Sequence, residues 1–173
     1  WGFQTNLIGL TQELDTRILR GGYEMVMPGG FISFGGIRTD YSKRVSASLS
    51  YDYDAKGSQS AESYRLEPGI TLRPINTLKI GLTASYAGNR DQMQYITTRE
   101  FSTGDRYILG TIDQQTMEFT FRLDYSITPE LSVQYYGSPF VSKGIYTDFK
   151  YVSDPKNSEF EGRFVLYPDP VLV

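Results

Sequence analysis

Apolar and polar residues alternate along most of the chain. In residues 44–54 (RVSASLSYDYD) the odd positions are Val45, Ala47, Leu49, Tyr51 and Tyr53, and most of the even ones are serine or aspartate. A period of two is typical of a β-strand with one apolar face. The same alternation is clear in residues 63–74, 77–87, 115–128 and 130–141, and weaker in 2–10, 30–39, 92–99 and 106–112. The pattern predicts an all-β chain of about nine strands.

The connections between these strands predict a sheet with two unlike ends. TDYSK, RPINT and ITPEL are short and contain the Pro, Asn or Asp residues that favour tight turns. The connections through residues 11–30 and 53–63 are longer and more polar. We therefore expect an antiparallel up-and-down meander in residues 1–141, with short periplasmic turns and longer outer loops. Residues 142–173 are expected to be an extracellular loop or tail that leads toward closing strands elsewhere, and residues 11–20 are the one candidate for a short helix.

The length and charge of the strands favour a transmembrane β-barrel. Strands of about 10 to 13 residues suit a tilted membrane crossing and exceed the usual length in soluble sheets. The positions expected to face lipid are Val45, Leu49, Tyr51, Ile70, Leu72, Ile80, Leu82, Phe119, Phe121, Leu123, Tyr125, Leu131, Val133 and Tyr135. The positions expected to face the lumen are Arg65, Glu67, Arg73, Lys79, Glu118, Arg122, Asp124 and Gln134. Tyrosines near strand ends suit a membrane interface.

Two further points bear on this fold. An odd count of about nine strands does not close a simple bacterial barrel, so we expect part of a larger one. The end of the chain, RFVLYPDPVLV, lacks a long alternating closing strand. A soluble sandwich or lipocalin also has one apolar face, so a soluble all-β sheet is the alternative.

Composition excludes several classes of function. The chain has 173 residues, which suits one domain, and contains neither Cys nor His. This removes disulfides, Ser-His and Cys-His catalysis, and most zinc, haem and iron–sulfur ligand sets. The net charge is −3, without a basic stripe, so nucleic acid is not an expected partner. We expect no catalytic residue and no cofactor in this segment.

A few side chains are candidates for binding. Asp52 and Asp54 project from the same strand face and could hold a hard cation through their carboxylates, although a solvated strand end explains them better. The charged lumen positions are expected to pair with one another inside the barrel. Three aromatic side chains past the last strand could stack on sugar rings, although packing within the loop explains them equally well: Tyr146, Phe149 and Tyr151.

Several segments resemble one known family. These are LRGG at residues 19–22, MQYITT at 93–98 and, above all, the order and spacing of TIDQQT, TPELSVQYY and PFVSKGIYTDFK within residues 106–164. They look like the C-terminal β-barrel region of an uncharacterised Gram-negative outer-membrane protein family. The N-terminal module of that family resembles family-nine carbohydrate-binding domains. The resemblance implies a cell-envelope location and a glycan-related role, and it transfers no active site.

The sequence thus predicts a segment of an outer-membrane β-barrel in a Gram-negative cell. Its expected role is a membrane anchor, a pore or a component of a larger envelope complex. The expected partners are membrane lipid or lipopolysaccharide, other outer-membrane proteins and a glycan. The alternatives are a soluble all-β carbohydrate-binding module and a non-catalytic part of an envelope hydrolase.

Overall fold

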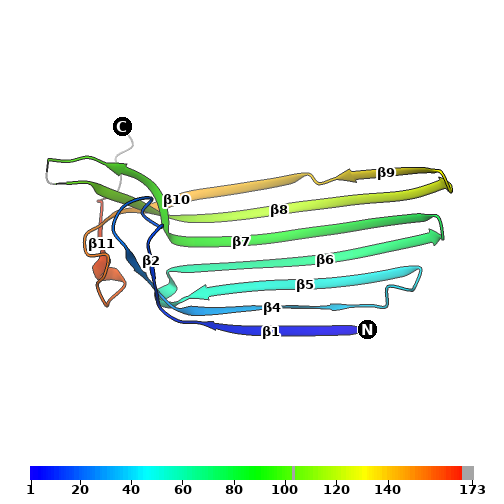
Figure 1. Cartoon of the computed structure of the whole chain (residues 1–173), viewed down its shortest axis with the longest axis horizontal. Coiled ribbons are helices and arrows are strands. Elements are labelled where there is room, and N and C mark those ends of the chain that lie inside the picture. Colours follow the sequence, from blue (N-terminus) through cyan, green and yellow to red (C-terminus); the bar gives the residue numbers. More distant parts are fainter. Residues whose placement is uncertain (103, 169–173) are drawn as a thin grey trace.

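The chain forms one large antiparallel sheet and a small two-stranded one, in a computed structural model that describes residues 1–102 and 104–168 (Figure 1). The strands are β1 (Gly2–Leu10), β2 (Glu13–Asp15), β3 (Met25–Met27), β4 (Gly30–Arg38), β5 (Val45–Lys56), β6 (Ala61–Ile75), β7 (Leu78–Arg99), β8 (Arg106–Thr128), β9 (Leu131–Gly137), β10 (Phe140–Val152) and β11 (Phe164–Leu166). Two 3₁₀ turns, η1 (Gly57–Gln59) and η2 (Glu161–Arg163), complete the elements. The described ranges contain no helix that is long and apolar enough to span a bilayer.

The large sheet is a meander in which each long strand pairs with the next one along the chain. Its order is β1-β4-β5-β6-β7-β8-β10-β11, and β9 also pairs with β8. β9 and β10 lie end to end along one side of β8, because β9 pairs with Phe121–Thr128 and β10 with Ile108–Glu118. Every pairing is antiparallel. The predicted all-β antiparallel architecture is therefore confirmed.

The sheet is open in the described residues, so these strands do not close a barrel by themselves; the sequence predicted part of a larger barrel. β1 forms one edge, and β9 with β10 forms the other (Figure 1). The barrel prediction came from the alternation of apolar and polar residues along the strands. This alternation indicates which face of a sheet is apolar, but it does not indicate whether the sheet curves into a ring. Closure depends on whether the two edges meet, and here they are separated by the full width of the sheet.

Two predicted strand breaks are absent. Residues 77–87 and 92–99 form one strand, β7, and residues 106–112 and 115–128 form another, β8. The polar stretch 88–91 looks like a turn in hydropathy, yet its backbone pairs with Ile112 to Gln115 on β8. Backbone hydrogen bonds do not depend on side-chain polarity, so pairing continues where the alternation fades. The nine predicted segments thus correspond to seven observed strands, β1 and β4 to β9, of which β7 and β8 each combine two segments.

Three other boundaries also differ from the sequence predictions. Residues 142–152 belong to β10, where a loop was expected, and residues 169–173 of the predicted tail lie outside the described residues. The expected helix at residues 11–20 is wrong, because Glu13–Asp15 is strand β2. The connection between β5 and β6 is shortened to residues 57–60, because both strands extend into the expected loop.

A compact cap covers one end of the sheet. The cap consists of residues 11–29 and 153–168, which pack against the projecting ends of β7, β8 and β10 (Figure 1). Its buried core is Leu19, Met25, Met27, Met93, Leu109, Phe160 and Phe164. The short turns that join β4 to β5, β6 to β7 and β8 to β9 lie at the other end. We call these the cap end and the turn end.

Hydrogen bonds join the two segments of the cap. The guanidinium of Arg163 is 1% exposed and donates to the carbonyl oxygens of Val26 at 2.7 Å and Asn157 at 2.9 Å. The amide of Val26 donates to the Pro155 carbonyl at 3.0 Å. At the surface, Lys156 forms an ion pair with Glu24 at 3.1 Å. Segments more than 100 residues apart are thus held together at one end of the sheet.

The cap also encloses a lysine. Lys150 is 3% exposed, and its ammonium lies 4.5 Å from the ring centre of Phe164 and 5.7 Å from that of Phe160. Burial disfavours the charged form and lowers the pKa of Lys150 below its usual value of 10.5. The neighbouring carboxylates of Glu161, Asp148 and Asp91 oppose this shift only in part.

The stability of the cap is therefore expected to rise as the pH increases from the lowered pKa of Lys150 toward 10.5. Over that interval the unfolded state binds more protons than the folded state, so raising the pH favours folding. Thermal unfolding at a series of pH values measures this. Lys150→Met should remove the rise, and Lys143→Met, an exposed change on the same strand, should keep it. An unchanged pH profile in Lys150→Met contradicts the prediction.

Candidate functional site

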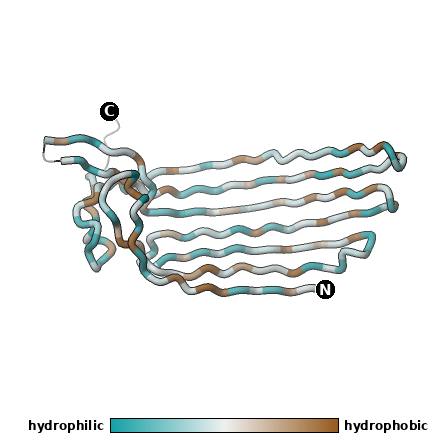
Figure 2. The backbone as a smooth tube through the Cα atoms, in the orientation of Figure 1, coloured by the Kyte–Doolittle hydropathy of each residue, from teal (hydrophilic) through white to brown (hydrophobic). Residues whose placement is uncertain are grey.

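One face of the large sheet is lined by apolar side chains in rows that cross the strands. We call it the apolar face. One row is Val45, Leu72, Ile80, Leu123 and Tyr135, each directly opposite the next. The neighbouring row is Ala47, Ile70, Leu82 and Phe121. Beyond the next row, which contains Leu49 and Phe119, lies the row of Tyr51, Leu66, Tyr86, Met117 and Val141. The alternation along each strand is visible in Figure 2. The structure thus gathers all the positions predicted to face lipid onto one surface.

This apolar face is uncovered in the described part of the chain. Val45 is 57% exposed, Phe119 55% and Tyr135 57%. The buried hydrophobic side chains lie mainly in the cap, not over these rows. A soluble monomer rarely leaves so large a contiguous apolar surface in water, so the face requires a covering medium or partner.

Tyrosines lie toward both margins of the apolar face. Toward the cap end, the rings of Tyr64 and Tyr86 are 6.0 Å apart, and the Tyr51 hydroxyl lies 2.6 Å from that of Thr5. Toward the turn end, Tyr125 lies opposite Leu78 and Val133. Such rings suit a boundary between an apolar and an aqueous region, because one end of each side chain is apolar and the other is polar.

The ring of Tyr64 lies over Gly88, and this fit gives a testable prediction. A methyl group at Gly88 would come 2.6 Å from the Tyr64 hydroxyl oxygen, so Gly88→Ala should displace the ring and cost about 1 to 3 kcal/mol. On the same strand, Gly81→Ala should be tolerated, since its nearest contact would be Arg122 at 3.8 Å. Urea unfolding of both variants measures the difference, and equal midpoints would contradict the fit.

A row of charges marks where the apolar face stops. Beyond Tyr86 and Met117, the next rows toward the cap end contain Lys143 and then Glu62, Arg90 and Asp113, which lie opposite one another on β6, β7 and β8. On the other side of this boundary, the named apolar rows contain no Asp, Glu, Lys or Arg. The charge-free surface is therefore a band that ends at this charged row on the side of the cap end.

The opposite face is polar and contains every position predicted to face the lumen. These are Arg65, Glu67, Arg73, Lys79, Glu118, Arg122, Asp124 and Gln134. Between them lie small side chains, including the cross-strand row Ser48, Gly69, Thr83 and Thr120. We call this surface the polar face.

The charged side chains of the polar face do not pair as predicted. Among residues 1–102 and 104–168, the single ion pair is Lys156 with Glu24 in the cap. Glu118 instead accepts a hydrogen bond of 2.6 Å from the Ser138 hydroxyl, and Arg122 lies 5.2 Å from the ring centre of Tyr136. Lys79 lies directly opposite Asp124, and Arg65 directly opposite Asp52, yet neither pair forms an ion pair in the described ranges.

The candidate cation ligands remain isolated. Asp52 lies opposite Phe34 and Arg65, and Asp54 lies opposite Ile32 and Ser63. No group of three or more Asp, Glu, His or Cys side chains suited to a metal occurs in the described ranges. The pair therefore lacks the further ligands that a protein calcium site supplies.

The aromatic candidates for sugar stacking lie on β10 rather than in a loop. Tyr151 packs against Tyr167, with ring centres 5.5 Å apart, and against the Arg106 guanidinium at 4.7 Å. These contacts at the cap end account for the position of Tyr151 without a sugar ligand.

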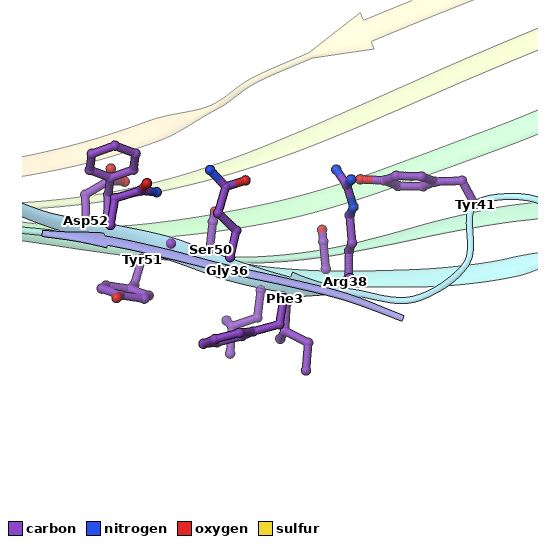
Figure 3. A pocket seen from close by; sticks show the side chains of 15 residues that line it. Phe3, Gly36, Arg38, Tyr41, Ser50, Tyr51 and Asp52 are labelled. Atoms are coloured by element: carbon purple, nitrogen blue, oxygen red, sulfur yellow. The ribbon is translucent and has the colours of Figure 1, made fainter.

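A hollow of about 500 Å³ surrounds the edge formed by β1 (Figure 3). Phe3 and Tyr51 lie on its apolar side, and Arg38, Tyr41 and Asp52 lie on its polar side. Gly35 and Gly36 also line it. The hollow thus continues around a free strand edge and opens on both faces of the sheet.

A family model described as a domain of unknown function (DUF5916) matches residues 10–160. The chain belongs to this family. The match runs from the last residue of β1 to the core residue Phe160 in the cap, so it includes both faces and most of the cap. No curated protein and no solved structure matches the chain. The expected family of uncharacterised function is thereby supported, and its description assigns neither a membrane nor a carbohydrate.

The sequence reasoning missed the residues that hold the cap. Lys150 and Arg163 look like ordinary surface charges in a polar stretch, and nothing in their spacing predicts burial. The apolar segment MVM between two glycine pairs was the sequence feature that could have indicated a buried cap, because Met25 and Met27 belong to its core.

Proposed function

We propose that this chain is a wall segment of an outer-membrane β-barrel in a Gram-negative envelope, where it serves as a membrane anchor or as part of a pore. The observation that carries the proposal is the uncovered, charge-free apolar face of the large sheet. Lipid is the medium that covers such a face without a second protein layer, since barrels of this class present apolar side chains outward.

The height of the apolar band supports this proposal. Met117 and Ile127 lie ten positions apart on β8 and are both on the apolar face. At about 3.3 Å per residue this is about 33 Å of strand. A tilt of about 45° reduces it to about 23 Å along the bilayer normal. The apolar band of outer-membrane barrels is about 25 Å tall.

The polar face fits the interior of such a barrel. Its charges and small hydroxyl side chains suit water or a polar plug, and its position opposite the lipid face follows from the period of two. Membrane lipid or lipopolysaccharide is then the partner of the apolar face. Tyrosines near both ends of the band, such as Tyr86 and Tyr125, support this assignment because such rings suit a membrane interface.

Two adjacent residues provide a direct test. Leu82 lies between Ile70 and Phe121 on the apolar face, and Thr83 lies between Gly69 and Thr120 on the polar face. Because the chain has no cysteine, Leu82→Cys and Thr83→Cys each accept one nitroxide label. In lipid vesicles the label at residue 82 should be relaxed by oxygen and the label at residue 83 by a water-soluble nickel complex.

The two sites control for each other, since they share one strand and one depth. Equal access of the nickel complex to both labels would overturn the membrane proposal. A protein that is monodisperse in plain buffer would do the same, because the apolar face would then have another cover.

A further inference from the structure

Both edges of the large sheet carry backbone groups that need partners in a bilayer. Within residues 1–102 and 104–168, β1 pairs only with β4, so its outer side has no partner there over Gly2–Leu10. On the other edge, β11 pairs with only Lys150–Val152 of β10. In hydrocarbon each unpaired amide or carbonyl costs several kcal/mol, so a membrane-embedded sheet must pair these edges.

The strand directions prevent the two edges from pairing with each other in the antiparallel sense. Every pairing from β1 through β4, β5, β6, β7 and β8 to β10 is antiparallel, and an even number of steps separates β1 from β10. The two edges therefore run in the same direction. An antiparallel ring would need an odd number of additional strands between them.

A second copy of the chain does not solve this problem. Placed with the same membrane orientation, the copy would bring its β10 edge beside β1, and that pair would again be parallel. Pairing β1 with β1 of the copy is antiparallel only if the copy is inverted across the membrane. The neighbour of β1 must therefore be a different strand.

The hollow around β1 indicates what that neighbour supplies. Its apolar side contains Phe3, which is 74% exposed, and its polar side contains Asn6. A strand laid along β1 would place alternate side chains on the two sides. The side next to Phe3 calls for apolar groups, and the side next to Asn6 calls for polar ones.

We propose that β1 pairs in the membrane with an antiparallel strand of the same polypeptide that lies outside residues 1–173, and that an odd number of such strands completes the ring. Each long strand here pairs with its neighbour along the chain, and Gly2 lies at the end with the short turns (Figure 1). A short connection at that end suits a strand from the same polypeptide. This inference rests on the proposed membrane function.

Photo-crosslinking of the full-length polypeptide in its native membrane tests the proposal. The photoreactive amino acid p-benzoylphenylalanine replaces Phe3 in one variant and Phe119 in the other. Both are exposed aromatic residues, but Phe3 lies on the free edge strand β1, whereas Phe119 lies inside the sheet on β8. We expect the probe at Phe3 to form an internal bond to a peptide outside residues 1–173, and the probe at Phe119 to react with lipid.

The alternatives give different products. A Phe3 bond to residues 1–173 of a second molecule, to another protein, or to lipid alone would overturn the pairing proposal. The Phe119 variant reports on the membrane proposal separately, since lipid adducts there support membrane exposure whatever the Phe3 probe does. If the Phe119 probe yields no lipid adduct, the proposed function itself fails.

Discussion

Leu123→Arg is expected to destabilise the sheet in lipid vesicles by about 2 to 4 kcal/mol and to impair its insertion. Leu123 lies between Ile80 and Tyr135, in a row of the apolar face without charge. A guanidinium there must either enter hydrocarbon or bend toward an interface, and both cost free energy. Urea unfolding in vesicles, followed by circular dichroism, measures the loss.

The adjacent Arg122→Leu variant is the matched control. Arg122 is exposed on the polar face, where its guanidinium lies over the Tyr136 ring. Its loss should cost no more than about 1 kcal/mol, the usual value of an exposed cation–π contact. Equal losses from the two substitutions would mean that the faces are wrongly assigned, even if the sheet itself is correct.

Arg163→Gln is expected to release the cap at a cost of about 3 kcal/mol, because it removes charge-assisted hydrogen bonds and leaves buried carbonyls unpaired. The guanidinium of Arg163 is the buried link between residues 153–168 and the carbonyl of Val26. Hydrogen exchange in residues 11–29 and 153–168 should accelerate, while exchange in β5 and β6 should not change.

Lys156→Gln serves as the comparison for Arg163→Gln. It removes the ion pair with Glu24, which joins the same two segments at the exposed surface. Exposed pairs contribute only about 0 to 1 kcal/mol, so the exchange rates should stay close to those of the unchanged protein. If Lys156→Gln releases the cap as much as Arg163→Gln does, burial is not what makes the Arg163 link strong.

The strand pattern could be predicted where one face of a strand is apolar along its whole length. β5 and β9 lie within a few residues of the predicted segments because their alternation is nearly complete. The prediction failed between residues 88 and 91, where the polar sequence Gly-Asn-Arg-Asp suggested a turn. That stretch continues β7 because β8 supplies backbone partners, and those partners lie more than 20 residues away in the sequence.

For the apolar and polar faces as well, part could be predicted from the sequence and part could not. The membership of the apolar and polar faces was predictable, since parity along each strand decides it. The contacts made by individual charges were not, because they depend on register. Glu118 contacts Ser138 only because the chain crosses from β9 to β10 beside it, and the sequence contains no signal for that position.

By itself, the sequence determined the all-β character, the side of the sheet on which each residue of a strand lies, and the exclusion of His- and Cys-based chemistry. These properties follow from composition and from a period of two that acts locally. Only the tertiary structure decided the lengths of β7 and β8, the buried cap around Lys150 and Arg163, and the parallel direction of the two free edges. Each of these depends on pairing or packing between segments distant in the chain, and local alternation carries no information about such partners.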